Sequence, residues 1–147
     1  MSDTPAFGTQ VIGQTEKALN AILDRMLAGT GLTEPQWVTL TLAAASGGTL
    51  GRDQLISRMA GALKVRQEAA QERITELAAA QLVHAPADDG SPVQLTDAGQ
   101  QLYSQVRTAV TDIIQRLWGD LPAEDLATAG RVLNTVTTRA NAELANL

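Results

Sequence analysis

Residues 82–99 read LVHAPADDGSPVQLTDAG, and this stretch decides the fold. Two short apolar runs flank a turn-forming sequence, DDGS, at residues 88–91. Asp-Gly favours the positive φ angles that a tight antiparallel turn requires. A helical pattern ends near Gln81, and another begins after Thr96, a typical helix N-cap residue. The stretch therefore predicts one β-hairpin between two helices.

Apolar residues recur at steps of three and four along the rest of the chain, which is the period of amphipathic helices. Six helices are expected: one ending near Gly29, one from the capping-box sequence TEPQ at 33–36 to Gly47, one over 52–60, one over about 64–80, one from Thr96 past Leu117, and one from Pro122 onward. Gly61 is expected to form the turn between the third and fourth helices, and Ala70, Ile74 and Leu77 the buried face of the fourth.

A single hairpin that follows a helix in an otherwise helical chain is typical of a winged helix. The fold class predicted is mainly α with one small β-hairpin wing, a winged helix-turn-helix with terminal dimerisation helices. Residues 31–95 are expected to form the winged-helix DNA-binding region, and residues 1–30 and 96–147 the helical dimerisation region of one intertwined unit. Such folds normally lay the helix before the hairpin in a DNA groove.

Composition permits this fold without selecting its function. The chain has 147 residues, of which 44% are hydrophobic, enough to bury one sizeable core. It has no cysteine, which excludes disulfides and thiol redox sensing. No signal-like leader or long apolar run is present, so a cytoplasmic protein without a membrane partner is expected. The net charge of -5 argues against sequence-independent coating of nucleic acid.

No group of residues has the pattern of a catalytic or metal site. His84 is the only histidine, and a structural or surface role is expected for it rather than a ligand contact or a pH-sensitive hydrogen bond. Asp88 and Asp89 are adjacent in a turn and so diverge. The sequence GGTLG at 47–51 lacks the lysine and the preceding strand of a phosphate loop. We therefore expect neither an enzyme nor a cofactor or metal.

Several short motifs resemble, in order and spacing, the MarR-type (multiple antibiotic resistance regulator) family of winged-helix repressors. The motifs are Gly31-Leu32-Thr33, Gln36-Trp37 and Leu40 around the start of the second helix, Leu55 in the third, Leu77 and Leu82-Val83 at the end of the fourth, and Leu95-Thr96 with Gly99 after the hairpin. The resemblance covers nearly the whole chain. It implies an obligate homodimer built from the first, fifth and sixth helices, a DNA-reading fourth helix, and often a small aromatic or phenolic effector.

The sequence departs from this family in two places. Family wings usually carry an Asp-x-Arg motif whose arginine reaches the minor groove, whereas residues 85–98 contain three aspartates and no basic residue. In the fourth helix, Glu68 and Glu72 are expected near the centre of the exposed face, where family members usually have neutral or basic residues. Both departures predict weaker attraction to phosphate.

DNA-binding residues are expected in the third and fourth helices. Lys64 and Arg66 at the start of the fourth helix would contact phosphates or bases, and Arg52 and Arg58 would clamp phosphates beside the groove. The glutamines of the fourth helix suit adenine edges, and Glu68 suits the N4 amino group of cytosine. The predicted set is Arg52, Arg58, Lys64, Arg66, Gln67, Glu68, Gln71 and Arg73. The alternative for each arginine is an ordinary solvated helix surface.

An effector site is expected between the first, second and fifth helices, lined by Trp37 and reached by Arg25 or Arg107. The alternatives are that Trp37 is ordinary core and that both arginines are unpaired surface residues. Tyr103 and Trp118 are expected to pack in a dimer rather than to stack on a ligand. The predicted dimer interface is Leu19, Leu102, Val106, Val110, Ile113, Leu117 and Leu133.

The function predicted from these residues is that of a homodimeric transcriptional regulator. It would occupy a pseudo-palindromic double-stranded operator and release it when a small aromatic or anionic effector binds. The alternative is a winged-helix dimer that has lost tight DNA binding and works as a protein-interaction or ligand-binding module. Binding at two salt concentrations separates the two, because phosphate contacts make affinity fall steeply with salt.

Overall fold

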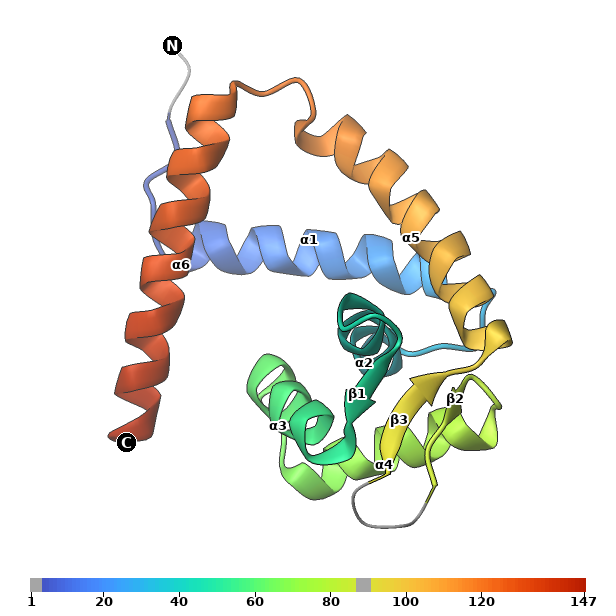
Figure 1. The fold of residues 1–147 in the computed structure, drawn as a ribbon. Coiled ribbons are helices and arrows are strands. Elements are labelled where there is room, and N and C mark those ends of the chain that lie inside the picture. The colour runs from blue at the N-terminus through green and yellow to red at the C-terminus, as the bar shows by residue number, and fades with distance from the viewer. Residues whose placement is uncertain (1–3, 87–90) are drawn as a thin grey trace. The chain divides into compact units, whose positions relative to one another are not determined.

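The computed structural model describes residues 4–86 and 91–147, shown in Figure 1. Its elements are α1 (Thr9–Leu27), α2 (Glu34–Ala45), β1 (Thr49–Gly51), α3 (Arg52–Leu63), α4 (Gln67–Ala79), β2 (Val83–His84), β3 (Pro92–Leu95), α5 (Asp97–Trp118) and α6 (Ala123–Ala145). The chain divides into two compact units, Met1–Val110 and Thr111–Leu147. The first unit is a winged helix, so the predicted fold class is confirmed.

The sheet has three antiparallel strands in the order β1-β3-β2. Strands β2 and β3 are the predicted hairpin, with Val83 opposite Leu95, while its turn at Asp88-Asp89-Gly90 lies outside the described residues. Strand β1 was not expected, and it pairs Leu50 with Val93 on the other side of β3. Two glycines with positive φ, Gly47 and Gly48, end α2 and lead the chain into this strand.

The core of the first unit lies where α2, α3 and α4 pack against one another and against the sheet. The face of α4 predicted to be buried is confirmed, since Ala70, Ile74 and Leu77 are at most 1% exposed. The largest fully buried side chains are Leu27, Leu40, Leu55, Met59, Ile74, Leu77, Val93 and Thr39. Helix α4 therefore has a fixed orientation, with one face in the core and the other in solvent.

The boundary between α3 and α4 differs from the sequence-based prediction. Gly61 lies inside α3, which continues to Leu63, and Lys64 is the left-handed C-cap residue with φ 56°. The backbone N–H of Lys64 donates to the carbonyl of Ala60, which closes the helix. Arg66 is the N-cap of α4, in an extended conformation. The prediction of a glycine turn was wrong because a lysine adopts the left-handed conformation that glycine usually occupies.

Two predicted helix caps are confirmed. Thr33 Oγ1 accepts from the N–H of Gln36 at 3.4 Å, and Gln36 Oε1 accepts from the N–H of Thr33 at 3.1 Å, which is a complete capping box. Thr96 Oγ1 accepts from the N–H of Gly99 at 3.0 Å and donates to the carbonyl of Gln81 at 2.7 Å. Thr96 therefore ties the start of α5 to the end of the α4 segment.

The second unit contains the C-terminal part of α5 and all of α6, and none of the residues of α6 is buried. Its apolar side chains are exposed to an unusual extent, with Leu133 at 44%, Val132 at 40% and Val136 at 37%. Among the described residues, no helix is both long enough and apolar enough to span a bilayer.

Candidate nucleic-acid interface

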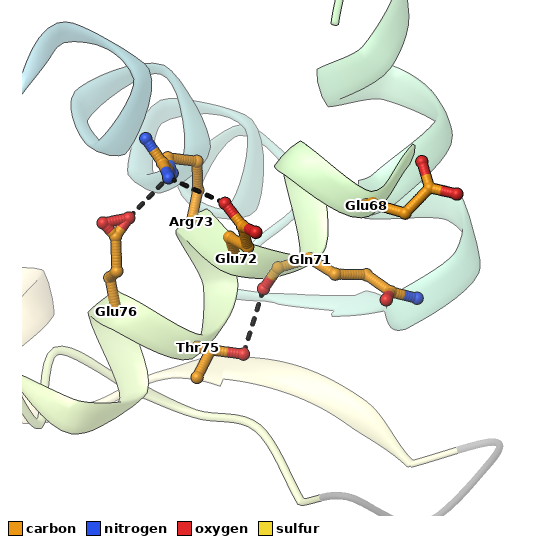
Figure 2. A pocket seen from close by; sticks show the side chains of 6 residues that line it. All are labelled: Glu68, Gln71, Glu72, Arg73, Thr75 and Glu76. Atoms are coloured by element: carbon orange, nitrogen blue, oxygen red, sulfur yellow. Dashed lines mark hydrogen bonds and ion pairs between the residues drawn. The ribbon is translucent and has the colours of Figure 1, made fainter. Parts of the chain in front are cut away.

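Helix α4 presents one polar stripe to solvent. Glu68, Gln71, Glu72 and Thr75 are spaced by three and four residues and so lie on one face, on the side of the helix away from the buried Ala70 and Leu77. With Arg73 and Glu76 they line an open hollow along the helix, shown in Figure 2. This stripe confirms that Glu68 and Glu72 lie on the exposed face.

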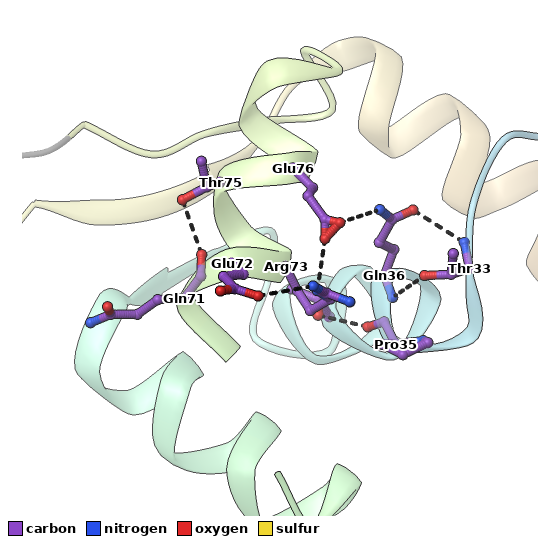
Figure 3. A network of polar contacts seen from close by, with 9 residues as sticks. Thr33, Pro35, Gln36, Gln71, Glu72, Arg73, Thr75 and Glu76 are labelled. Atoms are coloured by element: carbon purple, nitrogen blue, oxygen red, sulfur yellow. Dashed lines mark hydrogen bonds and ion pairs between the residues drawn. The ribbon is translucent and has the colours of Figure 1, made fainter. Parts of the chain in front are cut away.

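A polar network joins this helix to the start of α2, as Figure 3 shows. Arg73 Nε lies 2.7 Å from Glu76 Oε1, and Arg73 Nη2 lies 3.3 Å from Glu72 Oε2. Gln36 Nε2 donates to Glu76 Oε2 at 3.4 Å, and the Gln36 side chain is itself held by the capping box. Arg73 is thus paired with two carboxylates, and its charge is compensated locally.

The roles of Glu76 and Gln36 were missed by the sequence reasoning. The spacing of three between Arg73 and Glu76 is a visible signal for an ion pair on a helix. The contact between Gln36 and Glu76 joins residues 40 positions apart, so no local pattern could have revealed it.

The remaining basic residues of the predicted set have different surroundings. Arg58 is exposed on α3, and its Nη1 donates to Ser46 Oγ at 3.2 Å. Lys64 and Arg66 are exposed in the connection between α3 and α4 rather than inside the helix. They therefore lie beside the N-terminus of α4, next to Gln67, the first residue of that helix.

Arg52 at the start of α3 is directed at the wing. Its Nη2 donates to the carbonyl of Pro86 at 2.8 Å and to the carbonyl of Ala85 at 3.1 Å. Its Nε is buried and has no hydrogen-bond partner in the part of the chain that the structure describes. The guanidinium therefore holds the backbone that leaves β2, and a phosphate contact would compete with these two bonds.

The aromatic residues of the first unit form a stacked pair in the core. The rings of Trp37 and Tyr103 lie 5.4 Å apart with an interplanar angle of 23°, and each residue is 8% exposed. Arg107 Nη1 donates to the Tyr103 hydroxyl at 2.7 Å. The core alternative for Trp37 is confirmed. Dimer packing of Tyr103 and an unpaired Arg107 were wrong predictions, because the two residues bind each other beside the stacked rings.

The residues of the predicted dimer interface divide into two groups. Val106 is 5% exposed, and Leu102 and Val110 pack against the core of the first unit. Leu19 at 36%, Leu117 at 40% and Leu133 at 44% have large exposed fractions, Ile113 is half-buried, and Trp118 is 36% exposed. Leu19, Leu117, Leu133 and Trp118 therefore have the largest apolar surfaces available to another molecule.

The remaining candidates carry no evident chemistry. His84 is exposed on β2, opposite Gln94 of β3. Within residues 4–86 and 91–147, no group of three histidine, aspartate or glutamate residues could hold a metal ion. Arg25 is exposed at the end of α1.

By sequence, no family model and no curated protein matches the chain. By structure, it is similar to winged-helix proteins, and the matching structures include MarR-family regulators that it covers almost entirely. A MarR protein from Peptoclostridium difficile aligns with a TM-score of 0.75 at 18% identity over 97% of each chain. AbsC, a MarR family transcriptional regulator from Streptomyces coelicolor, aligns with a TM-score of 0.72 at 22% identity, over 95% of this chain and 99% of that chain.

A mutant MarR from E. coli complexed with operator DNA aligns with a TM-score of 0.69 at 23% identity, over 86% of this chain and 91% of that chain. These similarities show that the chain has the winged-helix fold of MarR-family regulators.

Proposed function

We propose that this protein is a DNA-binding transcriptional regulator of the MarR type, acting in the cytoplasm as a homodimer without catalytic activity. The observation that carries the proposal is the exposed stripe of α4 in a winged helix-turn-helix, the element that such folds place in the major groove. A protein of the same fold is known in complex with operator DNA, which supports this assignment.

The DNA contacts proposed are of two kinds. Lys64, Arg66 and Arg58 are the exposed cations of α3 and its connection to α4, and they would bind phosphates near the N-terminus of α4. Gln67 and Gln71 would read adenine, and Glu68 would read cytosine. Arg52 would act mainly by holding the backbone of the wing, because its guanidinium donates to the carbonyl of Pro86. Arg73 would act mainly by holding side chains of α4, because its guanidinium is paired with Glu76.

The dimer would be formed by the apolar surfaces that one chain leaves exposed. Leu19 on α1, Leu117 on α5 and Leu133 on α6 are each more than a third exposed. Apolar area removed from water contributes about 25 cal/mol per Å², so a second copy is the natural way to cover such surfaces. A closed two-fold dimer would also match the symmetry of a pseudo-palindromic operator.

A titration of the purified protein with its own upstream DNA at two salt concentrations tests the proposal. Each phosphate contact contributes roughly 0.9 to the slope of log affinity against log salt. Lys64→Ala and Arg66→Ala should each weaken binding and lower the slope by about one unit. Arg139→Ala on α6 removes the same charge from the second unit and should leave the slope unchanged.

A second function is favoured by the charge of the α4 stripe. Its four residues include two glutamates and no cation, and the neighbouring Arg73 is paired with carboxylates. This is unfavourable for a surface that approaches phosphate, and it supports a winged-helix dimer that binds a protein or a small ligand instead. Weak binding with no dependence on salt and no preferred sequence would favour this second function.

A further inference from the structure

Glu72 occupies a special position on α4, because it is the one carboxylate of the exposed stripe that is bound to an arginine. Arg73 is anchored on its other side, where Nε lies 2.7 Å from Glu76 Oε1. Glu76 accepts in turn from Gln36 of α2 at 3.4 Å. The chain of contacts in Figure 3 therefore runs from the capped start of α2, through Glu76 and Arg73, to Glu72.

The exposed fractions decide which end of this ion pair faces outward. The side chain of Glu72 is 70% exposed, while that of Arg73 is 31% exposed. If Arg73 were the group offered to a base edge, it would be the more exposed partner. Instead Arg73 is held against the body of the unit, and the carboxylate of Glu72 is the group presented to solvent.

A carboxylate can only accept hydrogen bonds. In the major groove, guanine offers two acceptors and adenine offers an acceptor beside its amino group, whereas cytosine offers only the N4 amino donor. Cytosine is therefore the base whose major-groove edge offers a donor to a carboxylate without also placing an acceptor against the carboxylate oxygens. Arg73 compensates the charge of Glu72 through one carboxylate oxygen, Oε2, which reduces repulsion from nearby phosphates and leaves Oε1 for a base.

We propose that Glu72 is a specificity-determining residue that selects a cytosine in the operator by accepting a hydrogen bond from its N4 amino group. Arg73 is the positioning residue that holds the Glu72 carboxylate in place. The inference rests on the proposed function, since it assigns a base to a helix that must first enter the major groove.

Selection of preferred sites from a pool of random double-stranded DNA tests this assignment. The wild-type protein should enrich a C·G pair at one position of each half-site. Glu72→Gln should change the preference at that position alone, toward A·T, because an amide matches adenine. Glu143→Gln on α6 removes the same charge from the second unit and should select the wild-type sequence.

A modified operator gives a second measurement that needs no protein variant. N4-methylcytosine keeps the N–H that pairs with guanine but places a methyl group where the major-groove donor was. At the selected position it should weaken wild-type binding by about tenfold, and it should have no effect on Glu72→Gln.

The role of Arg73 is tested by coupling between the two residues. Arg73→Gln should lose discrimination at the same base pair, and adding it to Glu72→Gln should change that discrimination no further. A merely structural role would instead lower affinity for all sequences in both backgrounds. Urea unfolding of each variant measures any general loss of stability separately.

The outcomes distinguish this inference from the proposed function. If Glu72→Gln tightens binding to every sequence equally and selects the wild-type site, Glu72 only repels phosphate and the inference is overturned, while the regulator proposal stands. If the wild-type protein enriches no sequence and its binding does not vary with salt, both proposals are overturned.

Discussion

At the scale of single residues, Arg52 shows how a basic side chain beside the proposed DNA-binding helix can stabilise the fold instead of contacting a ligand. A string of arginines in the third and fourth helices is compatible with phosphate contacts, and the sequence alone cannot tell which guanidinium groups have partners within the chain. The structure gives Arg52 two backbone acceptors beyond β2, at Ala85 and Pro86. Its contribution to DNA binding would then come through the position of the wing.

Arg52→Ala should therefore lower stability and should lower DNA affinity without changing its salt dependence. Hydrogen bonds to a charged donor contribute about 1.5–3 kcal/mol each, and partial exposure places the two bonds at the lower end, for an expected loss of unfolding free energy of about 3 kcal/mol in total. Urea unfolding and a salt titration measure the two effects. Arg58→Ala removes an exposed guanidinium that donates to the Ser46 hydroxyl, and it should change stability by less than about 0.5 kcal/mol. A salt slope reduced by one unit in Arg52→Ala would show that Arg52 contacts phosphate after all.

The sequence located the residues of α4 well but could not assign their partners. The period of the apolar residues placed Ala70, Ile74 and Leu77 in the core and Glu72 on the surface, because burial follows helical spacing. The pairing of Glu76 with Gln36 depends on how α2 crosses α4, which is a tertiary property. The same holds for the stack of Trp37 on Tyr103, residues from α2 and α5.

At the scale of elements, the long periodic helices and the β2–β3 hairpin were predicted, whereas β1 and the end of α3 were not. Strand β1 has three residues and no alternation long enough to be recognised, so its pairing with β3 could not be predicted. The end of α3 was misplaced because Gly61 is a plausible stop signal, whereas the chain ends the helix at Lys64. Glycine inside a helix costs stability but does not forbid the helix.

Two glycines in helices should therefore respond in opposite ways to the same substitution. A Cβ at Gly99 in α5 would overlap the carbonyl group of Leu82, with the carbonyl carbon only 3.0 Å away, while a Cβ at Gly61 in α3 would meet nothing within 4 Å. Gly99→Ala should destabilise the protein by about 1–3 kcal/mol or more, because the backbone of α5 or of Leu82 must move to make room for the methyl group. Gly61→Ala should stabilise it by up to about 1 kcal/mol. Thermal unfolding of the two variants measures both, and equal shifts would contradict the close approach of α5 to Leu82.

At the scale of the whole molecule, the exposed apolar side chains of α6 predict association. Leu133 is 44% exposed and belongs to an apolar stripe of α6 with Leu126 and Val136. In a homodimer, Leu133→Asp would bury an unpaired charge and should dissociate it at micromolar concentration. Thr135→Asp adds the same charge on the opposite face of α6, because the two positions are about 200° apart around a helix. Sedimentation measures the effect, and a wild-type protein that is a well-folded monomer would contradict the dimer.

The effector site expected from the sequence lies within the core of the first unit. The expected ligand site beside Trp37 is filled by Tyr103 at 5.4 Å, and Arg107 is bonded to the Tyr103 hydroxyl. An aromatic acid could enter only by displacing the tyrosine ring, and its carboxylate would then replace the hydroxyl as partner of Arg107. Binding would therefore be coupled to movement of the Tyr103 side chain on α5 relative to Trp37 on α2.

This coupling makes a quantitative prediction for Trp37 fluorescence. In a Trp118→Phe background Trp37 is the only tryptophan, because the chain has two, and titration with benzoate should change its emission as the stack opens. By linkage, operator DNA should weaken benzoate binding by the same factor by which benzoate weakens DNA binding. Arg107→Gln should weaken the benzoate affinity, while Arg25→Gln should do so only if Arg25 also reaches the ligand. Equal benzoate affinities with and without DNA would mean that the ligand prefers neither state, and an absent fluorescence change would leave Trp37 as ordinary core in a regulator that binds its operator constitutively.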